Sequence, residues 1–177
     1  MSKTYYHTQE SRKVTLTEPQ KCIREDAWLG DAFYFWADEF DAHQWGHNSK
    51  NRMKFFEIYS CSISSEKIID TVFNEEHYYF WLKQIEKIAK KIIVSTSEKP
   101  TIKELNDYIV EKKVWQDNVD AIQFQDLPTN NEHLLIKPIE YKNKKLRSIA
   151  YRKRIQLAIY NQNIIRNFAL HTKERVL

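Results

Sequence analysis

The chain has 177 residues, of which 42% are hydrophobic, 14% aromatic and 29% charged, with a formal net charge of +4. This length predicts a single domain over residues 1–177 with its own core, and the aromatic content argues against disorder. Cys22 and Cys61 form neither a metal-ligand spacing nor a disulfide framework, which favours a reducing, cytoplasmic compartment. We find no apolar run of signal-peptide or membrane-spanning length, so we expect no membrane partner.

The first third of the chain alternates strand patterns with one helix pattern. Strand formers occupy residues 3–8 ("KTYYHT"), 32–36 ("AFYFW") and 53–63 ("MKFFEIYSCSI"). Residues 17–25 predict a short helical turn with Pro19 in its first turn. Residues 38–45 ("DEFDAHQW") predict a helix that Asp38 caps.

From residue 65 to residue 115 the hydrophobic period changes to about 3.6 residues, as in a helix. Apolar side chains at steps of three and four run from Tyr78 to Ile92 and predict one amphipathic helix. Thr101 and Glu104 have the spacing of a capping box at the start of a second helix. We therefore expect a helical insertion at about residues 64–115.

Strand patterns return after residue 118, at residues 119–125, 133–141, 153–160 and 163–170. Only the polar "NQN" separates the last two, which predicts a hairpin. Strands at both ends of the chain and helices in its middle indicate an α+β fold.

A basic segment precedes the third of these strands. Residues 141–154 ("YKNKKLRSIAYRKR") carry seven basic residues and no acidic one. Such a cluster can follow the phosphates of RNA or DNA, and Tyr141 and Tyr151 add aromatic faces. A solvated surface arm is an equally ordinary interpretation, since lysine runs are common on protein surfaces.

Several familiar catalytic motifs are missing from the sequence. The two glycines, Gly30 and Gly46, cannot form a P-loop or a GxGxxG turn. No HExxH or paired Cys–His set indicates zinc, and no GxSxG marks a serine nucleophile. The sequence therefore predicts no metal site, and the missing motifs argue against the P-loop and hydrolase classes of enzyme.

Two stretches, "YYHTQ" (residues 5–9) and "GDAFYFWADEFDAHQWG" (residues 30–46), resemble the ADP-ribosyltransferase fold family. That family opens with a strand written Y-H-G-T or Y-H-G-S, followed by G-x-G-F-Y and a short A-x-x-W helix. Residues 154–168 ("RIQLAIYNQNIIRNF") resemble the closing strand pair of its bacterial members. The resemblance covers residues 4–60 and 119–170 and implies a split β-sheet core that binds NAD, with the helical insertion added.

The resemblance implies three catalytic residues: His7, Tyr34 and Gln156. His7 would hydrogen-bond a ribose hydroxyl, Tyr34 would stack on nicotinamide, and Gln156 would hydrogen-bond the ribose. Arg24 is a candidate for a pyrophosphate contact, because a guanidinium matches phosphate oxygens. The other cofactor-binding residues would be Thr8, Gly30, Trp36 and Trp45. Taken singly, these are also ordinary core or surface residues.

The sequence departs from the family pattern at three positions. Thr8 and Ala32 stand where the family has glycine, which would narrow a pocket. Gln156 cannot act as a general base at neutral pH. Acceptor activation would then fall to another residue, such as Glu140 or Asp126, or to the acceptor itself, or the domain would bind without turnover.

The expected function is that of an NAD-dependent ADP-ribosyltransferase-like toxin or phage-defence effector, held in check by an antitoxin. Its acceptor would be nucleic acid (RNA or DNA) or protein. Two alternatives stay open. One is a non-catalytic RNA- or DNA-binding module that uses residues 141–154. The other is an interaction protein that docks a partner along the Tyr78 to Ile92 stripe.

Overall fold

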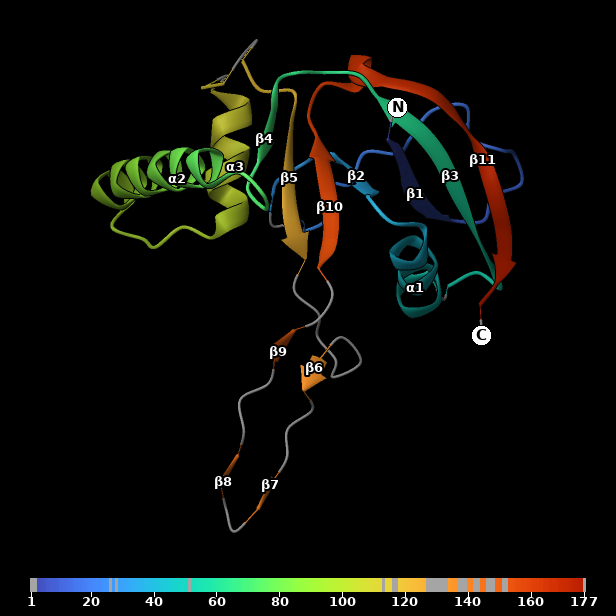
Figure 1. Ribbon diagram of the computed structural model, residues 1–177. Helices are drawn as coiled ribbons and strands as arrows, with labels where there is room; N and C mark the ends of the chain where they lie inside the picture. Colours follow the sequence, from blue (N-terminus) through green and yellow to red (C-terminus); the bar gives the residue numbers. More distant parts are fainter. Residues whose placement is uncertain are drawn as a thin grey trace.

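The computed structural model describes residues 3–25, 27, 29–50, 52–112, 114–115, 118–126, 134–136, 140–141, 144–145, 149–150 and 153–176. Within these residues the fold is α+β, as predicted (Figure 1). The helices are α1 (Glu39–Ser49), α2 (Glu75–Thr96) and α3 (Ile102–Glu111). The main sheet contains β1 (Thr4–Glu10), β2 (Phe33–Trp36), β3 (Phe55–Ile63), β4 (Ile68–Asp70), β5 (Ala121–Asp126), β10 (Arg154–Ile159) and β11 (Ile165–Arg175).

The seven strands lie in the order β11-β3-β1-β2-β10-β5-β4. Neighbours are antiparallel except β4 and β5, which are parallel. The join between β1 and β2 is narrow, because their register pairs only Tyr6 with Trp36. The sheet therefore consists of two parts, β11-β3-β1 and β2-β10-β5-β4, that meet at this pair.

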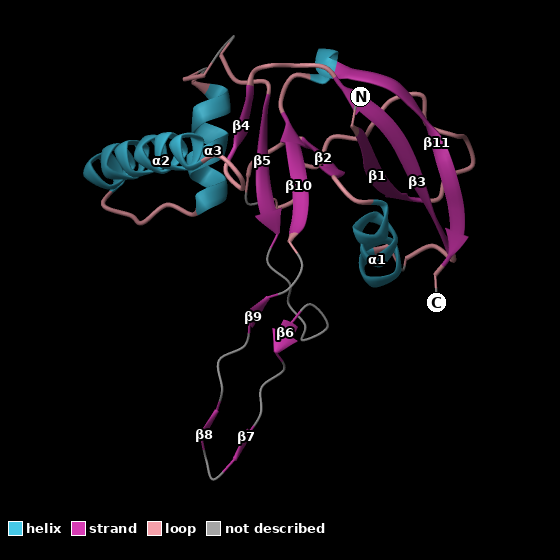
Figure 2. Cartoon of the chain, viewed as in Figure 1, coloured by secondary structure: helices cyan, strands magenta, loops and turns pink. Residues whose placement is uncertain are grey.

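The helices pack at two separate places, as Figure 2 shows, with α1 near β1 and β3 and the α2–α3 pair beside β4 and β5. Under α1 a cluster of Trp36, Ala42, Phe56 and Ile58 is buried. Under α2 and α3 a second cluster includes Leu29, Ile88, Leu105, Ile122 and Phe124. Because Trp36, Phe56, Ile58, Ile122 and Phe124 share one face of the sheet by register, both helical layers cover that same face.

Local capping signals are confirmed at two helix starts. The side chain of Asp38 accepts a hydrogen bond from the backbone N–H of Phe40 at 2.9 Å. Thr101 and Glu104 form the predicted reciprocal capping box at the start of α3. Helix α1 approaches β3 closely at Gly46, where an added Cβ would lie 2.3 Å from the ring of Phe56.

Three local predictions are wrong. Residues 17–25 form no helical turn; Cys22 instead makes an isolated antiparallel bridge with Ala32. Ile68–Asp70, inside the expected helical insertion, is strand β4 and pairs with β5. The expected hairpin of β10 and β11 does not form, because β2 and β5 occupy both edges of β10 and β11 pairs with β3.

Beyond the ends of β5 and β10, four short strands lie away from the main sheet (Figure 1). β6 (Leu134–Ile136) pairs with β9 (Ile149–Ala150), and β7 (Glu140–Tyr141) pairs with β8 (Lys144–Lys145). The strand expected over 133–141 therefore corresponds to two short strands, and 137–139 lie outside the described residues. Most side chains of the basic segment 141–154 also lie outside the described part of the structure. The side chains of Lys153 and Arg154 are described.

The apolar stripe of α2 is covered in its middle. Ile85 and Ile88 are buried in the core, and Trp81, Ala89 and Ile92 pack against it. The exposed apolar side chains at the start of the helix are Tyr78, Tyr79 and Phe80. The stripe from Tyr78 to Ile92 thus serves mainly to attach α2 to the sheet.

Candidate functional site: a cavity between β2, β10 and α1

A cavity of about 170 Å³ opens on the helix-covered face of the sheet. Its walls come from β2, β5, β10, α1 and the segment before β2. The lining residues are Cys22, Arg24, Ala27, Tyr34, Trp45, Asp126 and Gln156. Four of the residues that the family resemblance and side-chain chemistry predicted, Arg24, Tyr34, Trp45 and Gln156, are therefore brought together by the fold.

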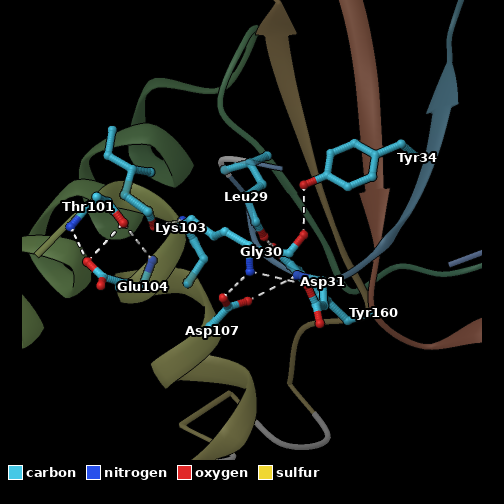
Figure 3. Close-up of polar contacts among 11 residues, drawn as sticks. Leu29, Gly30, Asp31, Tyr34, Thr101, Lys103, Glu104, Asp107 and Tyr160 are labelled. Atoms are coloured by element: carbon cyan, nitrogen blue, oxygen red, sulfur yellow. Dashed lines mark hydrogen bonds and ion pairs between the residues drawn. The ribbon is translucent and has the colours of Figure 1, made fainter. Parts of the chain in front are cut away.

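Tyr34 is held in place by one contact of its hydroxyl and one contact of its ring. Its hydroxyl donates a hydrogen bond to the backbone oxygen of Gly30 at 2.9 Å, as Figure 3 shows. Its ring meets Phe124 edge-on, with ring centroids 6.3 Å apart. Burial raises the pKa of Tyr34, so the phenol is neutral at physiological pH. Tyr34 can offer an aromatic face to a ligand but no charge.

The turn that receives the Tyr34 hydroxyl is held by helix α3 (Figure 3). The carboxylate of Asp107 accepts a hydrogen bond from the backbone N–H of Asp31 at 3.1 Å. Lys103 pairs with both Asp31 and Asp107. Gly30 has a φ of +83°, and an added Cβ would lie 2.7 Å from Asp107. The structure thus explains this glycine by the turn and by α3, and Gly30 does not line the cavity.

Trp45 lines the cavity and rests on Trp36, which is buried behind it at a centroid distance of 5.8 Å. The guanidinium of Arg154 lies 5.0 Å from the Trp36 ring. Arg154 also pairs with Asp126 at 3.0 Å. Burial raises the pKa of Asp126, and the neighbouring Arg154 opposes that rise. The cavity therefore has an aromatic wall and a carboxylate held by a cation.

His7 does not reach this cavity. The register pairs Tyr6 with Trp36 and Trp36 with Gln156, so His7 projects from the opposite face of the sheet to Tyr34 and Gln156. Its imidazole is 4% exposed and packs against Phe35. The predicted constellation of His7, Tyr34 and Gln156 thus does not gather around one hollow.

The hydrogen bonds of His7 are all made inside the protein. Nδ1 donates to the backbone oxygen of Tyr34 at 2.8 Å, because a carbonyl can only accept. Nε2 then accepts from the Gln9 amide at 2.9 Å and from the backbone N–H of Gln20 at 3.4 Å. Burial lowers the pKa of His7 to about 4, which agrees with a neutral ring. Thr8 is buried as well, and its hydroxyl donates to the backbone oxygen of Ala42.

Sequence reasoning considered Asp126 only as one candidate for acceptor activation and missed the pairing partner Arg154 altogether. The signal lay in the strand alternation, since Arg154 and Gln156 fall on the same face of β10 and Asp126 pairs with Arg154. Nothing in the sequence marked Cys22 or Ala27 as lining residues. Within the described ranges, no group of three histidine, cysteine or acidic side chains could hold a metal ion.

Comparisons with protein families, curated proteins and solved structures found no match for this chain. Among the helices that the structure describes, none has the length and apolar content that crossing a membrane requires.

The arrangement suits a planar ring joined to a polar group. Tyr34 and Trp45 supply aromatic faces, Gln156 an amide, Asp126 a carboxylate and Arg24 a guanidinium. The volume of about 170 Å³ is below the roughly 300–1,000 Å³ of a pocket that encloses a whole drug-sized ligand. The cavity therefore has room for a ring-sized group, while the rest of a larger ligand would lie outside it.

Proposed function

We propose that this protein is an NAD-dependent ADP-ribosyltransferase-like enzyme that holds the nicotinamide end of NAD in the Tyr34–Trp45 cavity. The observation that carries the proposal is that Arg24, Tyr34, Trp45 and Gln156 line one cavity although they come from four separate segments. The narrow β1–β2 join supports the same proposal, since the family resemblance implies a split core sheet.

The reaction replaces the bond between ribose C1′ and the nicotinamide nitrogen with a bond between C1′ and the acceptor. The electron pair of the broken bond leaves with nicotinamide, and the acceptor loses one proton. Positive charge develops on the ribose as in other glycosyl transfers. The chain's contribution is to orient the ring and the sugar and to stabilise that charge.

Each lining residue has a role that its chemistry permits. Tyr34 and Trp45 would stack on nicotinamide, and the Gln156 amide would hydrogen-bond the ribose hydroxyls. Asp126 would supply the negative charge that Gln156 lacks and accept the proton from the acceptor. Arg24 would pair with the pyrophosphate at the cavity mouth. His7 has no contact with the substrate in this proposal.

The biological setting is proposed from the family resemblance alone. We propose a toxin or phage-defence effector that an antitoxin protein restrains. The acceptor would be nucleic acid or protein.

The decisive experiment is to incubate the protein with NAD labelled in the adenylate part, together with cell lysate, and to measure nicotinamide release and label transfer. We expect Trp45→Ala, Gln156→Ala and Asp126→Asn each to lower the rate at least about tenfold, within the usual range for a positioning or acid–base group. Gln162→Ala, which changes an exposed glutamine outside the cavity lining, is the matched control. Equal rates in all four variants would contradict the assignment of the site. A wild-type protein that neither binds nor cleaves NAD would contradict the proposed function.

A second candidate function is that of a non-catalytic RNA- or DNA-binding module. It is supported by one contact of Lys153, near the end of the basic segment 141–154. The ammonium of Lys153 lies 4.9 Å from the ring of Phe73, whose side chain is exposed. Exposed aromatic rings beside cations are typical of nucleic-acid surfaces. A thermal shift with NAD separates the two candidates: the transferase requires one, and a pure binding module gives none.

A further inference from the structure

A second cavity of about 280 Å³ lies on the same face of the sheet, under helix α2. Its lining residues are Leu29, Thr71, Tyr78, Trp81, Ile122, Phe124 and Gln125. Phe124 forms part of its wall and also contacts Tyr34 edge-on at 6.3 Å. This aromatic pair therefore connects the wall of the second cavity with the wall of the proposed nicotinamide site.

One residue of the cavity wall, Trp81, carries an unsatisfied donor. The indole Nε1–H of Trp81 is buried and has no hydrogen-bond partner in the described part of the chain. Buried donors are nearly always paired, so an orphaned one requires an explanation such as a ligand. The hydroxyl of Thr71 is already used, since it donates to the backbone oxygen of Gln123. The cavity wall thus includes aromatic residues, one of which has a donor that still lacks an acceptor.

Tyr78 and several aromatic residues near it in the sequence are exposed. Tyr78, which lines the cavity, is 40% exposed, and Phe73, Tyr79 and Phe80 nearby in the sequence are exposed as well. Lys153, at the end of the basic segment, lies over Phe73. Aromatic platforms next to cations hold single-stranded nucleic acid, because every base has a face to stack and every linkage has a phosphate. The surroundings therefore favour one class of ligand.

We propose that the second cavity binds one unpaired base of a single-stranded nucleic acid, which is the acceptor of the transferase. The base stacks on Tyr78 and accepts a hydrogen bond from Trp81 Nε1, while Lys153 contacts the backbone phosphates. The acceptor strand then lies beside the ribose that Gln156 holds. This inference rests on the proposed function for the role of acceptor, but binding of a base can be tested without NAD.

The test measures fluorescence anisotropy of labelled single-stranded RNA, single-stranded DNA and a matched duplex. We expect single strands to bind more tightly than the duplex, because the base must leave its stack to enter the cavity. Trp81→Phe keeps the ring and removes only the donor, and Tyr78→Ala removes the stacking face. Each should weaken binding of the single strand about tenfold, the usual loss for one stacked or hydrogen-bonded base.

Two matched controls accompany these variants. Phe55→Ala removes an exposed ring of β3 that lies outside the cavity lining, and Trp115→Phe removes the orphaned indole N–H of a residue that lines a different cavity. Both should bind the single strand within about twofold of the wild type, since a change this small is under 0.5 kcal/mol. Equal losses in all four variants, or duplex binding as tight as single-strand binding, overturns the base site.

The outcome also separates this inference from the proposed function. A wild-type protein that responds to NAD but binds no oligonucleotide contradicts the base site and leaves the transferase standing. Oligonucleotide binding that depends on Trp81 in a protein without any NAD response supports the base site and contradicts the transferase.

Discussion

His7 and Tyr34 are joined by a hydrogen bond of 2.8 Å from the imidazole Nδ1 to the backbone oxygen. The bond crosses the join between β1 and β2, where the register pairs a single residue from each strand. Because the Tyr34 side chain projects from the other face, His7 supports the strand that carries the ring without touching the cavity. His7 is therefore a positioning residue behind Tyr34.

Replacing His7 by alanine should lower the free energy of unfolding by about 2–4 kcal/mol, because a buried bond is lost, the Tyr34 carbonyl is left unsatisfied and a cavity forms. Urea denaturation followed by tryptophan fluorescence measures the change. His171→Ala, which removes an exposed histidine that pairs with Glu39, should cost less than about 1 kcal/mol. A His7 variant as stable as the His171 variant would contradict the positioning role.

Stability should fall on acidification because of the same histidine. Unfolded His7 takes up a proton near pH 6.5, whereas burial lowers its pKa in the folded protein to about 4. Between these values the unfolded state binds more protons, so its free energy drops relative to the folded state as the pH decreases.

The measurement compares urea unfolding at about pH 7 and pH 4.5 for the wild type and for His7→Asn, whose amide can still donate to Tyr34. The wild type should lose up to about 3 kcal/mol more than the variant over this window. Parallel losses in both proteins would show that other groups cause the acid sensitivity.

The Gly30 turn should not tolerate a side chain. Gly30→Ala places a Cβ at a φ of +83° and 2.7 Å from the Asp107 carboxylate, which Asp31 and Lys103 hold in place. We expect a loss of about 2–3 kcal/mol, of which about 1–2 comes from the backbone conformation. In the background of Asp107→Ala the same substitution should cost only the backbone part. A double-mutant cycle measured by thermal unfolding tests this, and strict additivity would refute the contact.

Arg154 should be needed to compensate two carboxylates, Asp126 at 3.0 Å and the buried Asp41, whose Oδ1 lies 3.9 Å from the Arg154 Nε. Arg154→Met keeps much of the packing on Trp36 but leaves the half-buried Asp126 carboxylate without its cation at 3.0 Å. Breaking a largely buried ion pair costs about 3–5 kcal/mol, and solvent at this partly exposed pair reduces the expected loss to about 2 kcal/mol. Adding Asp126→Asn should recover the part of the loss that comes from Asp126 in urea denaturation, while the part that comes from Asp41 remains. If the second substitution recovers nothing, the two side chains are not coupled.

Much of the local structure was predictable because its causes are local. The Asp38 cap, the Thr101–Glu104 capping box and the period of α2 depend on residues within one or two helical turns. The membership of Tyr34 and Trp45 in one site was also predictable, since a short connection joins β2 to α1 and limits their separation. Strand β4 was missed because three residues are too few to show a period of two against a helical background.

The sequence by itself determined the α+β class, the starts of α1 and α3 and which aromatic residues follow Gly30, because propensity, capping and periodicity act over short distances. Only the tertiary structure decided which face each strand presents, since a shift of one residue in register moves every side chain to the other side of a sheet. That choice separates His7 from Tyr34 and Gln156, places Asp126 beside Arg154 and sends β11 to the edge at β3. Strand pairing between distant segments is a property of the whole sheet, which no single segment encodes.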